Sequence, residues 1–375
     1  MSVTTDGTGG TTEPDLDEQI GAFADRLFEA TIGAMEMAVA HLGRALGLYQ
    51  GLRGGTGHTA AELAVATAVD TRYAREWLEH QALAGTLTVD DPAAPAEQRR
   101  YSLPEAHAVV LLDEEHPAYS GALADIPAII ARTLDTLLGA FRTGAGIPFA
   151  AYGLHDMQAG FTRPMFANSL AGEWLAALPD VHDRLQAGEA LRLADFGCGE
   201  GWAAIYLAEA YPNATVYGYD LDEASIAAAC KHAAERGVTD RVRFEVQDVT
   251  DPAFGERFDL VFCCEVIHDL ADPVGALAAM RRLAGDEGAV LVIDERADEE
   301  YTPSGDLIQR LLYAFSILHC LPAGRDAETS AETGTVMRPS TFRGYAEAAG
   351  FTGVDELPVD NPFFRFYRPR TGATA

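Results

Sequence analysis

Cysteine is scarce in this sequence, and no pattern pairs the cysteines that occur. The five are Cys198, Cys230, Cys263, Cys264 and Cys320, an odd number with no CxxC pair and no His/Cys spacing typical of zinc ligands. A disulfide framework and a metal site are therefore not expected, and the cysteine usage fits a reducing cytoplasm.

Basic residues are also few. The chain has 27 Lys and Arg against 57 Asp and Glu, which gives a formal net charge of −30. Such a field repels phosphate backbones and anionic lipid surfaces. We therefore expect neither nucleic acid nor a membrane as a partner, and the charge places no restriction on small ligands.

Two kinds of targeting segment are not seen in the sequence. The first residues, 1–14, are small, polar and acidic and lack the basic and apolar regions of a signal peptide, so we expect a disordered tail. We find no uninterrupted apolar run of about 18 residues, and no membrane span is expected. The prediction is a cytoplasmic protein.

The length and composition instead indicate a globular chain with two domains. Its 375 residues exceed one ordinary compact core, and 48% of them are hydrophobic. A glycine-containing hinge, residues 144–153, separates helical patterns from a βα alternation. We predict a tail at 1–14, a helical domain at 15–153 and an α/β domain at 154–375.

The helical domain opens with a broad apolar stripe. Between Leu16 and Leu52 the apolar residues recur at helical spacing, and Gly33 and Gly43 are expected to divide this stretch into two helices. So broad a stripe favours burial against another subunit, so we predict a homodimer formed through this domain.

A winged-helix order follows. Thr59 and Glu62 form a capping-box pattern, a second helix spans 71–84, and 87–89 and 101–103 fit the strands of a wing. In the second helix we expect inward side chains at Tyr73, Trp77, Leu78 and Leu83.

This winged module is not expected to read DNA. The charged residues of its second helix sum to −1, whereas a DNA-reading helix carries a basic stripe; they are Asp70, Arg72, Arg75, Glu76 and Glu79. Packing or dimerisation is the favoured role, and a ligand-sensing regulator remains an alternative.

From Leu191 to Ile293 strands and helices alternate, as in a doubly wound parallel sheet. Helices are also expected at 162–178, beginning behind Arg163-Pro164, at 304–321 and at 340–349. Final strands are expected at 351–357 and 363–367.

A glycine loop follows the first strand of this alternation. Strand residues 191–196 lead into Gly197-Cys198-Gly199-Glu200-Gly201, and a helix opens at Trp202. The glycines allow a tight turn and close approach of a ligand to the positive end of a helix dipole. The GxGxG spacing differs from the dinucleotide GxGxxG and suits a ligand whose amino-acid tail lies across the glycines.

Two acids extend this site. Asp220 ends the second strand, where a carboxylate accepts hydrogen bonds from ribose hydroxyls, and Asp248 follows the third strand, where it can accept an adenine amine. Because ligands bind at the carboxyl edge of such sheets, the loop and both acids together form a specific signal.

These residues resemble the class I S-adenosylmethionine-dependent methyltransferases, and the preceding module makes the chain similar to their two-domain small-molecule type. The resemblance implies an α/β fold with a Rossmann-like, doubly wound, seven-stranded sheet behind a mostly helical winged-helix-like domain. The stretches 294–296, 318–322, 334–339 and 361–367 look like an actinobacterial branch of that group.

The same resemblance implies S-adenosylmethionine as cofactor and assigns its site. Asp195, Gly197, Gly199 and Gly201 would line the methionine end, Asp220 would hold the ribose, Asp248 the adenine amine, and Glu265 would lie near the methionine. Leu221 and Val249 belong to the same predicted site, and Trp202 either walls it or packs against the next helix.

A base is expected beside this cofactor. In similar O-methyltransferases a His-Asp pair after the fourth strand supplies the catalytic base, and an acid after the fifth strand orients it. His268 and Glu295 match those places. A carboxylate behind an imidazole would fix its tautomer and favour the cation formed on proton uptake. The alternative is that His268 and Asp269 only cap a turn and a helix.

The acceptor pocket is predicted less specifically. Its candidate residues are Tyr152, Phe161, Arg163, Asn168, Tyr313, His319 and Met337. Arg163 either clamps an anionic substrate or forms a salt bridge at the start of a helix. His319 is either core or pocket lining.

The resulting hypothesis is a methyltransferase that acts on a small, secondary-metabolite-like acceptor, with oxygen as the expected nucleophile. Nitrogen and carbon are alternatives, as is a cyclase-type enzyme that keeps the cofactor and does not methylate, because fold does not determine chemistry. The sequence does not name the acceptor.

Overall fold

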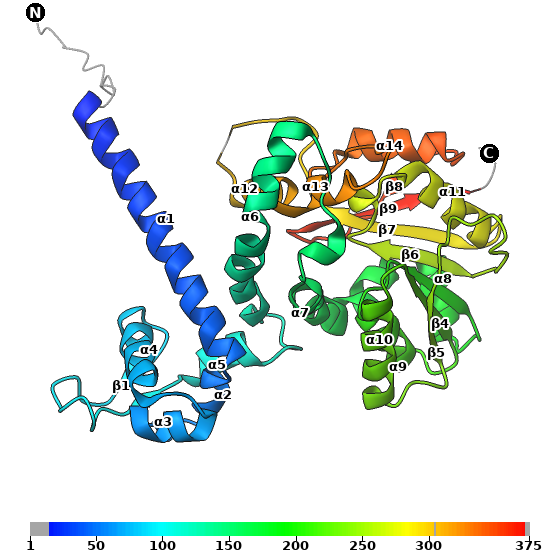
Figure 1. Cartoon of the computed structure of the whole chain (residues 1–375). Coiled ribbons are helices and arrows are strands. Elements are labelled where there is room, and N and C mark those ends of the chain that lie inside the picture. Colours follow the sequence, from blue (N-terminus) through cyan, green and yellow to red (C-terminus); the bar gives the residue numbers. More distant parts are fainter. Residues whose placement is uncertain (1–14, 304, 372–375) are drawn as a thin grey trace, which may run out of the picture. The chain divides into compact units, whose positions relative to one another are not determined.

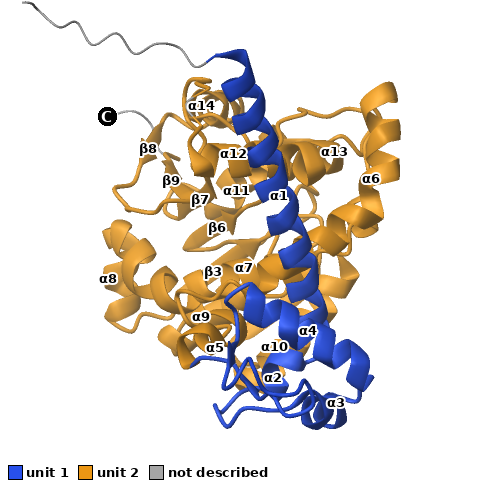
Figure 2. Ribbon diagram, turned by 90° about the vertical axis from the view of Figure 1, so that its left-hand side faces the viewer, with its two compact units in different colours: residues 1–104 blue, residues 105–375 orange. Residues whose placement is uncertain are grey.

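The computed structural model describes residues 15–303 and 305–371, and the expected tail at 1–14 lies outside them. By compactness the chain forms two units that meet between Pro104 and Glu105 (Figure 2). Residues 105–153 therefore belong to the second compact unit. The division into functional domains at residue 153 stays a prediction.

The first unit opens with one long helix where two were expected. Helix α1 spans Leu16–Ala45 and passes through Gly33 and Gly43; it ends at Leu46–Gly47, and α2 spans Leu48–Gly51. The prediction of a break at Gly33 or Gly43 was wrong. A Cβ atom at Gly43 would lie 2.5 Å from the Trp77 ring, so this glycine serves close packing and not a turn.

The winged-helix order is confirmed. Helix α3 (Ala60–Thr67) begins with the capping box of Thr59 and Glu62. Helix α4 spans Thr71–Leu83, and strands β1 (Thr88–Val89) and β2 (Tyr101–Ser102) pair antiparallel.

The inward face of α4 differs in part from the expected one. Trp77 and Leu78 are buried, but Tyr73 is 79% exposed and Leu83 89% exposed, so these two assignments were wrong. The buried positions of the helix are Ala74, Trp77, Leu78 and Gln81. That i, i+3, i+4, i+7 spacing is one helical face, and Tyr73 and Leu83 fall outside it.

The second unit begins with helices. They are α5 (Glu105–Leu112), the 3₁₀ helix η1 (Gly121–Asp125), α6 (Ile126–Thr143), the 3₁₀ helix η2 (Phe149–Ala151), α7 (His155–Met165), the π-helical η3 (Phe166–Trp174), the 3₁₀ helix η4 (Leu175–Ala177) and α8 (Pro179–Gln186). Pro164 lies inside α7, so the expected start behind Arg163-Pro164 was wrong. The π-helical register follows Pro164, whose missing amide disturbs the helical hydrogen-bond ladder.

A seven-stranded sheet follows these helices. Its strands are β3 (Arg192–Phe196), β4 (Thr215–Asp220), β5 (Val242–Val246), β6 (Leu260–Cys264), β7 (Ala289–Glu295), β8 (Val354–Glu356) and β9 (Phe364–Pro369). The order is β5-β4-β3-β6-β7-β9-β8, and β9 pairs antiparallel with both β7 and β8 (Figure 1). The predicted doubly wound α/β fold is confirmed.

Helices cover both faces of the sheet. On one side α8, η3 and α9 (Trp202–Ala210) pack in one core with β3, and α10 (Glu223–Arg236) packs against β4 and β5. On the other, α11 (Pro273–Ala284) and α14 (Pro339–Ala348) form the second core (Figure 1). Since β3, β4, β6 and β7 are parallel, their carboxyl ends meet at one edge.

One apolar helical run differs from our expectation. Helix α12 (Leu307–Phe315), the π-helical η6 (Ser316–Cys320) and α13 (Leu321–Gly324) are continuous. The run Leu307–Gly324 has a mean hydropathy of 1.2 and suffices to cross a membrane by length and composition alone. Gln309, Arg310 and His319 interrupt the apolar sequence, so it contains no uninterrupted apolar run of that length although its average stays apolar. A single such helix is weak evidence for a membrane span.

Candidate functional site

The glycine loop has the backbone geometry that its sequence predicts. Gly197, Gly199 and Gly201 have φ of 65°, 50° and 81°, the left-handed region that favours glycine. The Gly199 amide donates to Asp220 Oδ2 at 2.9 Å, so the acid at the end of β4 holds the loop in place.

A cavity of about 550 Å³ lies over this loop. It is lined by nine of the ten residues predicted to bind the cofactor: Asp195, Gly197, Gly199, Trp202, Asp220, Leu221, Asp248, Val249 and Glu265. The tenth, Gly201, packs instead: a Cβ atom there would lie 2.4 Å from the Phe244 ring and 2.8 Å from Ala229.

Asp195 presents an unpaired carboxylate oxygen in this cavity. The residue is 3% exposed, and its Oδ2 has no hydrogen-bond partner among the described residues. Burial, together with the charge of Asp220, raises the pKa of Asp195 well above its ordinary value. A buried acid in this state is stabilised by a ligand that brings a cationic group, such as the ammonium of an amino-acid tail.

Of the other predicted cofactor residues, Asp248 lines the cavity, and Trp202 both lines the cavity and packs against its neighbours. Asp248 is exposed and accepts hydrogen bonds from the Thr250 amide at 2.9 Å and from the Thr250 hydroxyl at 2.6 Å. Trp202 does both: it lines the cavity while its ring stacks on His232 at 4.5 Å and lies under the Arg163 guanidinium at 3.8 Å.

His268 lies at the same sheet edge, in the 3₁₀ turn η5 (Ile267–Asp269). Its Nδ1 is 2.7 Å from Asp294 Oδ1 and 2.8 Å from Glu295 Oε2, and its Nε2 is 3.2 Å from Asp269 Oδ1. The predicted pairing of His268 with Glu295 is therefore present in the geometry. Sequence reasoning missed Asp294, although it stands beside Glu295 at the end of a buried strand.

Asp269 does not cap the next helix, as the alternative interpretation had proposed. The cap of α11 is Asp272, whose side chain accepts from the Gly275 amide at 2.8 Å. Asp269 instead faces the imidazole of His268.

The acids around His268 determine its protonation. Burial opposes the charged imidazole, but Glu295, Asp294 and Asp269 outweigh it and raise the pKa of His268 well above its ordinary value. Burial raises the pKa of Glu265 to about 7, and this residue has a left-handed φ of 58°, a strained conformation of the kind found at functional sites.

A second cavity, of about 230 Å³, is lined by His268. It shares Gln158, Glu265 and Asp269 with the cavity over the glycine loop, so the two adjoin. Its lining includes five residues predicted for catalysis or the acceptor: Tyr152, Phe161, His268, Glu295 and His319.

Four predicted acceptor residues lie elsewhere. Arg163 donates to Glu115 Oε1 at 2.9 Å and also pairs with Glu114, so it forms a salt bridge, but in the last turn of α7 and not at the start of a helix. The Asn168 amide donates to the carbonyls of Glu115 and Pro164, Tyr313 accepts from Arg338, and Met337 is buried in the second core. None of the four lines either cavity as described.

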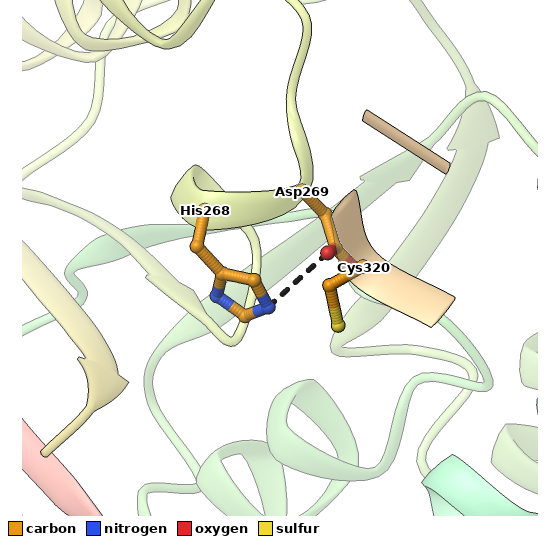
Figure 3. A group of neighbouring side chains, drawn as sticks. All are labelled: His268, Asp269 and Cys320. Carbon is orange, nitrogen blue, oxygen red and sulfur yellow. Dashed lines mark ion pairs between the residues drawn. The ribbon is translucent and has the colours of Figure 1, made fainter. Parts of the chain in front are cut away.

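His268, Asp269 and Cys320 come close enough together to resemble a metal-binding group. Their nitrogen, oxygen and sulfur ligand atoms lie within 4.8 Å of one another, and Figure 3 shows the imidazole directed at Asp269 with Cys320 beside it. Zinc accepts such ligands. The ion pair of a protonated His268 with Asp269 accounts for this arrangement without an ion, and the expected lack of a metal stays a prediction.

Sequence comparison assigns both parts of the chain. Residues 188–316 match the family described as "Methyltransferase domain", and residues 33–113 match the "Rv2258c-like winged HTH domain". A ubiquinone biosynthesis O-methyltransferase from Pseudomonas fluorescens (strain SBW25) is 28% identical over 178 residues, 47% of this chain and 72% of that protein. An uncharacterized protein, syc1184_c, from Synechococcus sp. is 36% identical over 90 residues, and the match spans 24% of this chain and 22% of that relative's length.

Solved structures share the whole fold at low sequence identity. The mitomycin 7-O-methyltransferase MmcR has a TM-score of 0.68 and 22% identity, covering 94% of this chain and 99% of its own. Human N-acetylserotonin methyltransferase, solved in complex with S-adenosylmethionine, has a TM-score of 0.66 and 17% identity, covering 97% and 100%.

The fold is that of the class I methyltransferases, which use S-adenosylmethionine as the methyl donor. The chain combines a match to a methyltransferase domain with a match to an Rv2258c-like winged helix-turn-helix domain. The recognition made from the sequence is confirmed.

Proposed function

We propose that the chain transfers the methyl group of S-adenosylmethionine to a hydroxyl oxygen of a small, secondary-metabolite-like acceptor, with His268 as general base. The observation that carries this proposal is the pair of adjoining cavities. One holds the glycine loop and the unpaired carboxylate of Asp195, the other holds His268, and Gln158, Glu265 and Asp269 line both.

The cofactor side supplies binding and orientation. The amides and close approach of the glycine loop suit an amino-acid tail, Asp195 would accept its ammonium group, and Asp220 would accept ribose hydroxyls. Transfer from a sulfonium is an in-line displacement, so the main task of the site is to align the acceptor oxygen, the methyl carbon and the sulfur. When bound, the cofactor supplies the electrophilic methyl group.

The acceptor side supplies a proton acceptor. Asp294 and Glu295 lie against Nδ1 of His268, and Nε2 faces Asp269, which lines both cavities. Because three carboxylates raise the pKa of His268, its neutral form accumulates only above the ordinary range of histidine. Once neutral, it is a strong base, and the same carboxylates stabilise the imidazolium formed when the acceptor loses its proton.

Product analysis tests the reaction class. The full chain would be incubated with methyl-labelled S-adenosylmethionine and a panel of small alcohols, phenols and amines. Mass spectrometry should find one added methyl group on oxygen. Conversion of an acceptor without gain of the label would instead support the non-methylating, cyclase-type alternative, and label on nitrogen or carbon would correct the nucleophile.

We also propose that the protein is a cytoplasmic homodimer that binds neither DNA nor a membrane. Helix α1 supports the dimer: across its 30 residues only Gly43 is buried. The net charge of −30 argues against DNA, and a gel-shift assay at several salt concentrations tests that point.

A further inference from the structure

The cavity beside His268 is small and carries negative charge at one end. Its volume of about 230 Å³ lies below the usual range for ligand pockets, about 300–1,000 Å³. Among the described residues that line it, Glu265, Asp269 and Glu295 are acids and none is Lys or Arg. Asp294 adds a fourth carboxylate directly behind the imidazole of His268.

The walls away from this end are apolar. Ile126, Ile129 and Ile130 of α6 line one part, and Leu311, Leu312 and Phe315 of α12 line another. A compact apolar body would therefore fill the cavity and displace its water. An anionic substituent would lose its hydration beside Asp269 and Asp294, whose two negative charges exceed the single positive charge of a protonated His268, and this loss is costly.

Two further polar atoms in the lining lack a partner. Tyr152 Oη and His319 Nε2 are buried and make no hydrogen bond with the described residues, and the two rings meet edge-on at 4.6 Å. Tyr152 is 1% exposed and His319 7%. Burial lowers the pKa of His319 and raises that of Tyr152, so both are uncharged. Buried polar groups in this state destabilise the site until a ligand pairs them.

This unpaired couple lies close to the base. His319 Nδ1 is 3.3 Å from Cys320 Sγ, and that sulfur lies within 4.8 Å of a ring nitrogen of His268 and of a carboxylate oxygen of Asp269. The polar atoms therefore gather at one end of the cavity, within reach of two substituents on a single small ring. Figure 3 shows Cys320 beside His268 and Asp269.

We propose that this cavity selects a compact, uncharged acceptor whose apolar ring carries two polar groups, the nucleophile at His268 and a neutral hydrogen-bonding group at His319 and Tyr152. The proposal rests on the proposed function, since it specifies the acceptor of that same site. His319 and Tyr152 act as specificity residues, and the carboxylates of Asp269 and Glu265 reject acceptors that carry an acid.

Three probes that share one hydroxylated ring test this selection. Phenol carries one polar group, 3-hydroxybenzamide adds a neutral hydrogen-bonding group, and 3-hydroxybenzoate places a charge in nearly the same shape. Their binding to the full chain saturated with S-adenosylhomocysteine would be measured by calorimetry and ligand-observed NMR. We expect the benzamide to bind about 10-fold more tightly than phenol and about 100-fold more tightly than the benzoate.

Variants assign the preference to residues. His319→Phe keeps the ring against Tyr152 but removes Nε2, so benzamide binding should weaken about 10-fold and phenol binding should change little. Tyr152→Phe should act in the same direction. Asp269→Asn should narrow the gap between benzamide and benzoate to about 10-fold. His182→Phe makes the same chemical change outside both cavities and should leave all three affinities unchanged.

Several results would overturn the proposal. They are equal binding of benzoate and benzamide, equal weakening of phenol and benzamide by His319→Phe, or no binding of any probe at millimolar concentration. These readouts need no methyl transfer. Failure to bind S-adenosylhomocysteine would count against the proposed function, and the probe preference would then be measured on the unliganded chain.

Discussion

His268 is the residue on which most of the proposed chemistry depends. Its imidazole is 2% exposed and contacts Asp269, Asp294 and Glu295 through its two ring nitrogens. One carboxylate would orient a buried imidazole, whereas three carboxylates also strongly stabilise its cationic form. The site therefore holds a proton that must leave before His268 can accept one from an acceptor.

Removal of this imidazole should abolish most turnover. We expect His268→Ala to lower kcat by about 10²–10⁴, the usual contribution of general base catalysis, while cofactor affinity barely changes. Glu295→Gln should cause a smaller loss, because Asp294 still orients the ring. The measurement is kcat with saturating acceptor, with S-adenosylmethionine affinity determined separately by calorimetry. Retained turnover in His268→Ala would support catalysis by proximity alone.

The pH dependence carries a signature of the carboxylates. The active form is the neutral imidazole, so kcat/KM should rise with pH through a value above the ordinary pKa of histidine. Asp294→Asn removes one of the charges that raise this pKa, so the acid limb of the profile should move to lower pH. Asp286→Asn, at an exposed position, is the control and should leave the limb in place. If the wild type, Asp294→Asn and Asp286→Asn all show the same acid limb, the titration of His268 does not produce it.

Asp220 is the second residue with a specific expectation. Its Oδ2 accepts from the Gly199 amide and its Oδ1 from the Asp222 amide, so it also orders the glycine loop. Asp220→Ala should weaken S-adenosylmethionine binding by about 10- to 100-fold, from the loss of hydrogen bonds to a charged group. Calorimetry gives the affinity, with Asp240→Ala on the surface as the matched control. Unchanged affinity in a folded Asp220→Ala protein would contradict the ribose assignment.

Among the elements, the loop between β3 and α9 is the one on which the proposed cofactor binding depends. Its last glycine, Gly201, has φ of 81° and faces the Phe244 ring and Ala229. Two separate constraints therefore exclude a side chain there, one from the backbone and one from packing.

Substitution of two glycines separates these constraints. Gly201→Ala should destabilise the protein by about 2–5 kcal/mol, from left-handed backbone strain plus overpacking. Gly237→Ala has the same sign of φ, 68°, but no atom within 4 Å of the added Cβ, so it should cost about 1–2 kcal/mol. Urea unfolding measures both. Equal losses of unfolding free energy in the two variants would show that packing against Phe244 adds nothing to the cost of Gly201→Ala.

At the scale of the whole molecule, helix α1 is an element whose apolar side chains stay exposed in a single chain. Large apolar side chains along it remain exposed, among them Leu16, Ile20, Phe23, Leu27, Phe28, Ile32, Met35, Leu42 and Leu46. Contiguous apolar surface of this kind marks an interaction site, and a second copy of the chain is the partner we propose.

Charge placed on this helix should separate the two copies. Light scattering of the wild type should report about twice the chain mass of 40.1 kDa. Phe23→Glu combined with Leu27→Glu should return a single chain mass, because two carboxylates would be buried without partners. Val65→Glu, an apolar residue that is 86% exposed outside α1, should remain dimeric. A wild type that is monomeric at micromolar concentration would refute the dimer.

Much of the fold and of the candidate cofactor site could be predicted from local sequence. The capping box at Thr59 and Glu62, the glycine loop and the acid at Asp220 depend on neighbours close in the chain, and all three are present as expected. Predictions from local sequence were wrong where packing between distant residues determined the structure. Gly43 continues a helix because the Trp77 ring requires its lack of a side chain, and Leu83 is exposed because the helix buries another face.

The sequence by itself determined the order of strands and helices, the cofactor loop and the place of His268, because these follow from hydrophobic period, glycine spacing and the ends of strands. Only the tertiary structure decided which distant residues share a cavity. It brought Tyr152 and His319 beside His268 and paired Arg163 with Glu114 and Glu115. Contacts between residues far apart in the chain depend on how whole elements pack, and no local pattern encodes that.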